Sequence, residues 1–192
     1  MKYNPNTHHR HTIRLQGYDY SQEGLYFITL VCKNKISQFG KIENGNMVLN
    51  QQGMIAQEEW HKTMNIRSKY VRLHSTIVMP NHIHAIIEII FNDKPLTILD
   101  NFEIQEDSLD NPFLKSTSKT IGSIIRGYKS AVSSKIGFSV WQRNYYDHII
   151  RNEKSYNLIA EYIKTNPSRW KYDSLNDNYI HGENMLNIGR LM

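Results

Sequence analysis

The sequence has a single cysteine, Cys32, among its 192 residues, and this scarcity excludes two kinds of site. One cysteine cannot form an internal disulfide framework, and it cannot supply the several thiolates of a zinc site. Cys32 ends an apolar run that begins at Tyr26. This setting indicates a buried structural thiol and argues against a nucleophile.

Long apolar runs and a leader are also missing. No stretch approaches the 18 consecutive apolar residues of a membrane-spanning helix. The first residues, MKYNPNTHHRHTIRL, lack the apolar core of a signal peptide. We therefore expect a cytoplasmic protein, and its length suits one domain with room for a core.

Positive charge is in excess and unevenly distributed. The net charge is +5, yet residues 93–110 hold six acids against one base, so the rest of the chain carries about twice that net charge. Such an excess is a plausible footprint for nucleic acid, although many soluble proteins share it. Residues 1–24 form a basic arm in which Arg14 could follow a phosphate backbone, or a solvated extension.

Hydrophobic periodicity predicts an α+β fold. We expect strands at 25–33, 71–79, 82–90 and 140–150, helices at 52–67, 120–136 and 152–168, and a hairpin within 39–50 that turns at Asn44-Gly45. Without the hairpin, this order is the βαββαβ pattern of ferredoxin-like sandwiches. We expect a folded domain at 25–170, with an acidic loop or partly disordered insertion at 91–118 and a loose tail at 171–192.

Two histidines bracket one isoleucine in the stretch Met79 to Ile87. In a strand, side chains alternate between faces, so His82 and His84 share a face about 7 Å apart. They could hold one metal ion if a third ligand came from elsewhere. The alternative is a pair of polar residues on a half-exposed strand.

A second pair of residues lies on the last predicted helix. Tyr162 and Asn166 are four residues apart and so share a helical face. A tyrosine hydroxyl can act as a covalent nucleophile, and an amide oxygen is a hard ligand. Two imidazoles and one amide oxygen suit Mg²⁺ or Mn²⁺ better than structural zinc. Tyr162 could equally be a packed aromatic residue.

Four motifs together resemble the REP-associated tyrosine transposases, a single-tyrosine branch of the HUH endonucleases. They are IRLQGYDYSQEGLYFITLV, MPNHIHAII, WQRNYYDHIIRN and EYIKTNP, which occur in the family's order between Ile13 and Trp170. The resemblance implies the HUH fold, a ferredoxin-like (RRM-like) sandwich with an extra hairpin and a C-terminal catalytic helix. The acidic loop and the tail depart from the family, which leaves the DNA target and any autoregulation open.

The resemblance also implies roles for individual residues. His82 and His84 would bind the catalytic metal, Asn166 would be the third ligand, and Tyr162 would be the nucleophile. The protein would cleave single-stranded DNA beside REP-like hairpins through a 5′-phosphotyrosine and rejoin it without ATP. Three other tyrosines compete with Tyr162 but lack a partner four residues on, before Pro167: Tyr145, Tyr146 and Tyr156. His148 could help Tyr162 ionise or could simply anchor its strand.

We expect DNA contacts from basic side chains and from the WQR motif. Trp141, Gln142 and Arg143 combine stacking, amide readout and a charged fork. Arg126, Lys129 and Arg151 are candidate phosphate contacts, or solvated charges. The chain would act as a monomer, although the wider family includes dimers. Two alternatives are a basic DNA-binding regulator of the same fold without catalysis and an unrelated phosphodiesterase that uses the histidines with water.

Overall fold

A four-stranded antiparallel sheet forms the centre of the molecule in the computed structural model, which describes residues 18–20, 22–90, 120–176 and 178. Its strands are β1 (Gly24–Val31), β4 (Val71–Val78), β5 (His82–Ile89) and β6 (Tyr146–Ile150), in the order β4-β5-β1-β6. Each neighbouring pair is antiparallel, which confirms the α+β prediction. The predicted insertion at 91–118, the arm up to residue 17 and the tail beyond residue 178 lie outside the described residues.

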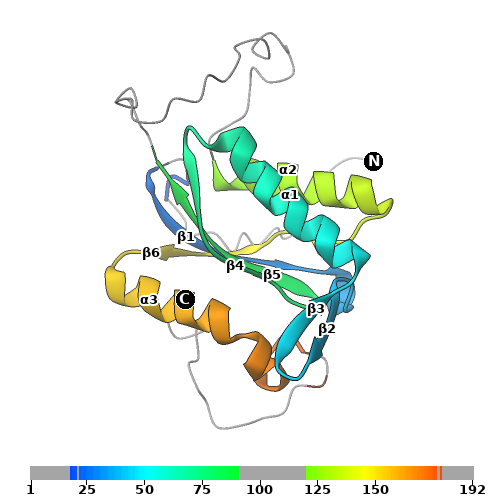
Figure 1. The fold of residues 1–192 in the computed structure, drawn as a ribbon. Helices are drawn as coiled ribbons and strands as arrows, with labels where there is room; N and C mark the ends of the chain where they lie inside the picture. Colours follow the sequence, from blue (N-terminus) through cyan, green and yellow to red (C-terminus); the bar gives the residue numbers. More distant parts are fainter. Residues whose placement is uncertain (1–17, 21, 91–119, 177, 179–192) are drawn as a thin grey trace, which may run out of the picture.

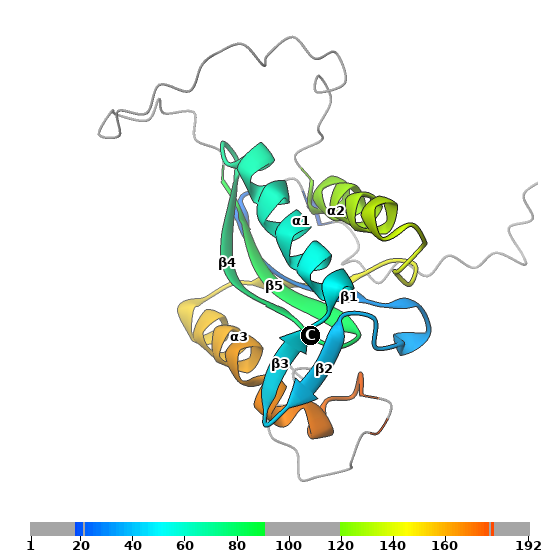
Figure 2. The same ribbon diagram turned by 45° about the vertical axis from the view of Figure 1, so that its right-hand side comes forward.

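Three helices cover the two faces of this sheet. They are α1 (Gln51–Arg67), α2 (Ile121–Ile136) and α3 (Glu153–Thr165). Helices α1 and α2 lie side by side on one face, whereas α3 lies alone on the other (Figures 1 and 2). In the described part of the chain, no helix is long and apolar enough to cross a membrane.

A separate hairpin joins β1 to α1. Strands β2 (Gly40–Glu43) and β3 (Asn46–Leu49) pair in antiparallel fashion across Asn44-Gly45, as the sequence predicted. Both turn residues have positive φ, 51° and 76°. Asparagine and glycine tolerate this left-handed backbone better than other residues do, which is why this dipeptide favours the turn. Before the hairpin, a short 3₁₀ helix, η1 (Lys33–Lys35), follows β1.

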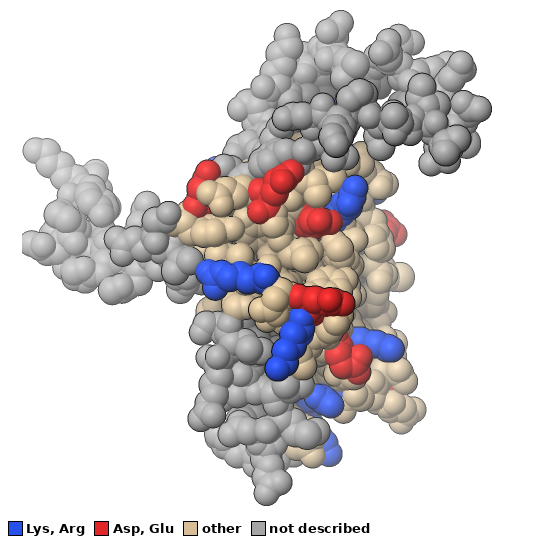
Figure 3. All heavy atoms as spheres, turned by 90° about the vertical axis from the view of Figure 1, so that its left-hand side faces the viewer, with Lys and Arg blue, Asp and Glu red and all other residues tan. Residues whose placement is uncertain are grey.

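One end of the sheet carries surface charges of both signs. At the end where β6 finishes and α3 begins, basic and acidic side chains are interspersed (Figure 3). The opposite end is where Val31 closes β1 and pairs with His82, the first residue of β5. The histidine motif therefore lies at the end away from this mixed surface.

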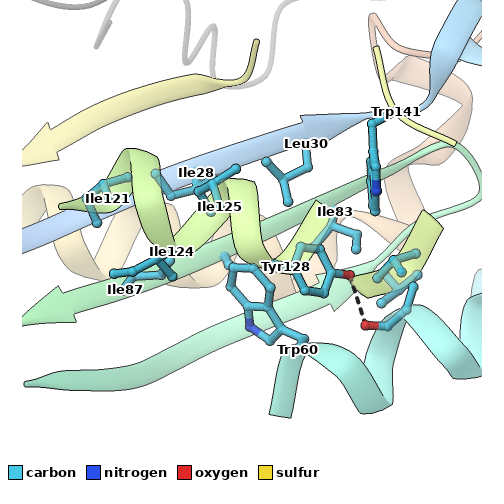
Figure 4. Packing of buried hydrophobic residues seen from close by; sticks show 14 of the residues in the cluster. Ile28, Leu30, Trp60, Ile83, Ile87, Ile121, Ile124, Ile125, Tyr128 and Trp141 are labelled. Carbon is cyan, nitrogen blue, oxygen red and sulfur yellow. Dashed lines mark hydrogen bonds between the residues drawn. The ribbon is translucent and has the colours of Figure 1, made fainter. Parts of the chain in front are cut away.

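The strands separate two apolar layers because their side chains alternate. On β5, Ile83 and Ile87 face α1 and α2, where they pack with Trp60, Tyr128 and Trp141 in the larger core cluster (Figure 4). The hydroxyl of Tyr128 donates to the carbonyl of Ala56, 2.9 Å away, and so ties α2 to α1. The other face packs Phe27 and Ile86 against α3.

Two predicted boundaries differ from the structure. The strand expected at 140–150 begins only at Tyr146, because the chain bends at Asn144, whose φ is 68°, and Trp141 makes only an isolated bridge to Cys32. The last helix begins after Asn152, whose side chain accepts a hydrogen bond from the Ser155 amide at 2.8 Å. It ends at Thr165, and Pro167 then starts a 3₁₀ helix, η3 (Pro167–Tyr172).

Candidate metal centre and nucleophile

His82 and His84 lie on β5, one of the two central strands of the sheet. Both side chains point to the α3 face, with 0% and 3% of their surface exposed, and their ring centroids are 4.4 Å apart. The alternation of strand side chains and the pairing of β5 with β1 and β4 fix this placement. The predicted shared face is confirmed, and the half-exposed alternative does not hold.

The two rings are neutral in their surroundings. Burial lowers the pKa of His82 to about 3. Burial, with His82 close by, also lowers the pKa of His84 well below its ordinary value. A neutral imidazole is the form that binds a metal ion.

Each histidine is held through its Nδ1 atom. The Nδ1 of His82 lies 2.9 Å from the Oδ1 of Asn81, and the Nδ1 of His84 lies 2.9 Å from the hydroxyl of Thr29. The Nε2 of His82 is buried and has no hydrogen-bond partner. The Nε2 of His84 lies 3.2 Å from the Tyr162 hydroxyl.

Helix α3 brings Tyr162 and Asn166 to the histidines. The ring of Tyr162 packs against His84 and, edge-on, against Phe27, with centroid distances of 5.2 and 6.3 Å. Asn166 is only 2% exposed, and its Oδ1 is buried without a partner. The structure thus brings together His82, His84, Tyr162 and Asn166, all of which were predicted from the sequence.

Asp173 also belongs to this cluster, and sequence reasoning missed it because residues 171–192 were expected to form a loose tail. Its Oδ2 accepts a hydrogen bond from the Nδ2 of Asn166 at 2.9 Å and lies 4.0 Å from the Nε2 of His82. Helix η3 turns the chain back to the site, and Trp170 within it lies against His82 at a centroid distance of 5.8 Å. The Asn-Pro pair that ends α3 was the one sequence signal of this turn.

The donor atoms fit a divalent cation. One atom each from His82, His84 and Asp173 lies within 4.8 Å of the others, and all three residues are buried. A buried carboxylate among neutral imidazoles needs a counter-charge, and the unpartnered atoms of His82 and Asn166 need a partner. A cation would meet both needs, and oxygen and imidazole ligands together suit several divalent ions.

The Tyr162 hydroxyl is protonated in this environment. Burial raises the pKa of Tyr162 above its ordinary value, and the charge of Asp173 adds to the effect. The hydroxyl lies 3.5 Å from the Oδ2 of Asp173 as well as close to His84. A cation held by these ligands would favour the phenolate, because a nearby positive charge stabilises it.

Tyr156 and His148 make other contacts than Tyr162 does. Tyr156 shares α3 with Tyr162, but its hydroxyl is 3.1 Å from the Nδ1 of His74, whose Nε2 is 3.1 Å from Glu88. His148 pairs across β6 with Phe27, and burial followed by the charge of Arg151 lowers its pKa. Within the described part of the chain, no hydrogen bond joins His148 to Tyr162.

The WQR motif is divided between the core and the surface. Trp141 is only 7% exposed, its ring packs on Phe39 and Tyr128, and its indole N–H donates to the Lys129 carbonyl at 3.2 Å. Trp141 therefore anchors its loop and presents no open ring face. Gln142 is half-buried, and Arg143 is exposed at the site end of the sheet.

The other predicted phosphate contacts have different settings. The ammonium of Lys129 donates to the carbonyls of Gln142 and Asn144, and burial lowers its pKa to about 8. Arg126 is exposed on α2, and Arg151 is exposed beyond β6, at the end of the sheet away from His82. Arg14 lies outside the described residues.

Two proteins of known sequence are similar to this chain. It is 46% identical over 179 residues to an uncharacterized protein of Haemophilus influenzae, covering 91% of this chain and 97% of that one, so the two belong to one family. A second Haemophilus influenzae protein, provisionally named a REP-associated tyrosine transposase, is 23% identical over 154 residues, which are 80% of this chain and 76% of that protein. No family model matches the sequence.

A solved structure shares the fold. It is a REP-associated tyrosine transposase bound to a REP hairpin, with a TM-score of 0.55 and 20% sequence identity, and the match covers 84% of this chain and 76% of that one. This likeness confirms the α+β fold with an antiparallel sheet that the sequence predicts.

Proposed function

We propose that this chain, which resembles the REP-associated tyrosine transposases in sequence and shares their fold, is a metal-dependent endonuclease and strand transferase for single-stranded DNA. The observation that carries the proposal is the buried cluster in which the Tyr162 hydroxyl lies 3.2 Å from His84, one of the proposed metal ligands. Hairpin-bearing DNA is the proposed substrate, as the related solved structure is bound to a REP hairpin.

The proposed ligands of the ion are four side chains. His82 and His84 contribute Nε2, Asp173 its carboxylate, and Asn166 its unpartnered Oδ1. When bound, Mg²⁺ or Mn²⁺ would polarise the scissile phosphate and offset the charge that builds up in the transition state. Asn166 also orients Asp173 through the bond from its Nδ2.

Tyr162 performs the covalent step in this proposal. The phenol loses its proton, its oxygen forms a bond to phosphorus, and the bond from phosphorus to the 3′ oxygen breaks. The products are a 5′-phosphotyrosine and a 3′ hydroxyl, formed when the leaving oxygen takes up a proton. The reverse attack by a 3′ hydroxyl rejoins DNA with no net loss of phosphodiester bonds. Because Tyr162 reaches His84 of its own chain, one copy holds all the proposed groups.

A covalent adduct tests the proposal directly. The full chain is incubated with Mn²⁺ and end-labelled single-stranded DNA hairpins, drawn from any inverted repeats found on either side of its gene, and the products are separated on a denaturing gel. We expect an adduct that Tyr162→Phe abolishes and Tyr156→Phe retains, since Tyr156 shares the helix but bonds His74. Cleavage that persists in Tyr162→Phe without an adduct would identify a water-using phosphodiesterase. Binding without cleavage would favour the non-catalytic regulator.

A further inference from the structure

Asn81 has a buried side chain that bridges three parts of the chain. It lies in the turn between β4 and β5, directly before His82, and is 1% exposed. Its Nδ2 donates to the carbonyls of Lys35 and Leu175, at 2.8 and 2.7 Å. Its Oδ1 faces the Nδ1 of His82 at 2.9 Å. Every polar atom of this amide therefore has a partner.

These partners fix the proton on His82. Two carbonyls can only accept, so they must face the amide nitrogen of Asn81, and its oxygen is left for the imidazole. That oxygen also can only accept, so the Nδ1 of His82 must carry the hydrogen. The lone pair then lies on Nε2, the buried atom that has no partner in the cluster.

The same amide holds the segment that carries Asp173. Asn81 binds the carbonyl of Leu175, and the Leu175 amide in turn donates to the Oδ1 of Asp173 at 2.7 Å. Beside it, the ammonium of Lys35 donates to the carbonyl of Ser174 at 3.2 Å. The carboxylate is thus tied to the turn before His82, although Asn81 and Leu175 lie 94 positions apart in the sequence.

We infer that Asn81 is a positioning residue of the metal centre. It presents His82 with a bare Nε2 and keeps the Asp173 carboxylate within reach of the same ion. This inference rests on the proposed function, because it takes a divalent cation as the ligand. The competing explanation is an asparagine that only stabilises a turn, as its backbone carbonyl does by accepting from the Cys32 amide at 2.8 Å.

The first test reads the tautomer in the metal-free protein. In ¹⁵N NMR spectra of the imidazole nitrogens, we expect His82 of the full chain to be protonated at Nδ1. Asn81→Ala should populate the Nε2-protonated form, because the acceptor at Nδ1 is gone. Asn50→Ala, which removes a side chain that caps α1 through the Gly53 amide, should keep the Nδ1 hydrogen on His82. An unchanged tautomer in Asn81→Ala, or the same switch in Asn50→Ala, would overturn the inference.

The second test measures Mn²⁺ binding without DNA, by electron paramagnetic resonance titration. Loss of a partner behind a metal ligand typically weakens affinity by about 10- to 100-fold, and we expect a loss of this size in Asn81→Ala. The matched control is Asn50→Ala, which removes a side chain that caps α1 through the Gly53 amide and binds the Gln38 carbonyl; within the described residues this side chain bonds no member of the cluster. It should lower stability and leave the Mn²⁺ affinity unchanged.

A double-mutant cycle shows whether Asn81 acts through Asp173. We expect Asp173→Asn to weaken Mn²⁺ binding, and Asn81→Ala to have a smaller effect in that background than in the wild type. Independent, fully additive losses would overturn the docking role. If the wild type binds no Mn²⁺, the proposed function fails; if the wild type binds and Asn81→Ala binds equally well, the inference alone fails.

Discussion

The two buried histidines make the stability of the metal-free protein depend on pH. Both histidines have pKa values below the ordinary value in the folded chain, and the pKa of His82 is about 3. As the pH falls, the unfolded chain therefore takes up protons on these histidines before the folded chain does. Their contribution is therefore fully present above about pH 6.5 and is lost as the pH falls below it. Each histidine should shift the folding equilibrium by up to about tenfold per pH unit in this window.

Urea unfolding in EDTA at pH 7 and pH 5 measures this effect. We expect His82→Gln to be less pH-dependent than the wild type, because one of the two titrating groups is gone. His61→Gln is the control, since His61 is exposed on α1 and should leave the wild-type dependence intact. Equal pH dependence in wild type and His82→Gln would contradict the assignment of a buried neutral ring.

Single residues were predictable where local spacing decides the outcome. Strand alternation placed His82 beside His84, and the helical repeat placed Tyr162 beside Asn166. Asp173 was not predictable, because its position depends on how η3 turns the chain and on contacts with Asn81. The burial of Trp141 was not predictable either. The WQR motif suggests an aromatic ring open to DNA, whereas the tertiary fold packs this ring against Phe39 and Tyr128.

Among the elements, the loop before β6 depends on a single lysine of α2. Lys129 donates to the carbonyls of Gln142 and Asn144, and its ammonium lies 6.0 Å from the Trp141 ring centroid. Such a connection explains why the strand predicted at 140–150 exists only from Tyr146. The carbonyls of Gln142 and Asn144 bond this side chain instead of a neighbouring strand.

Replacing this lysine should loosen the loop. We expect Lys129→Met to lower the free energy of unfolding by about 1–3 kcal/mol, because it leaves the partly buried Gln142 carbonyl without a donor. Lys135→Met, on the same helix, removes the ion pair of a 45% exposed lysine with Glu59, which keeps its pair with Lys62, and should therefore cost less. Urea unfolding measures both, and amide exchange should be faster around residues 142–144 in Lys129→Met alone. Equal costs in the two variants would show that the contact to the loop has no special role.

At the scale of the whole molecule, the candidate site lies at one end of the sheet. Exposed lysine and arginine side chains from three segments lie at the same end. They are Lys33, Lys35, Arg143 and Lys171. The backbone shows why they meet there: the Lys33 amide bonds the Val140 carbonyl, the Gln142 amide bonds the Val31 carbonyl, and η3 packs Trp170 on His82. The opposite end mixes both signs of charge (Figure 3), so a polyanion should meet the protein at the site end.

A pair of arginines at the two ends tests this orientation. Arg143 is exposed at the site end, whereas Arg151 is exposed at the far end of β6, where Ile150 pairs with Leu25. Each phosphate contact contributes roughly 0.7–0.9 to the slope of log affinity against log salt concentration. We expect Arg143→Ala to weaken binding of hairpin-bearing single-stranded DNA and to lower that slope by about one contact. Arg151→Ala should leave both the affinity and the slope nearly unchanged.

Fluorescence anisotropy across about 50–200 mM salt gives the slopes. Because both substitutions remove the same charge, an equal fall in the two variants would mean that net charge alone governs binding, and a fall confined to Arg151→Ala would place the DNA at the other end of the sheet.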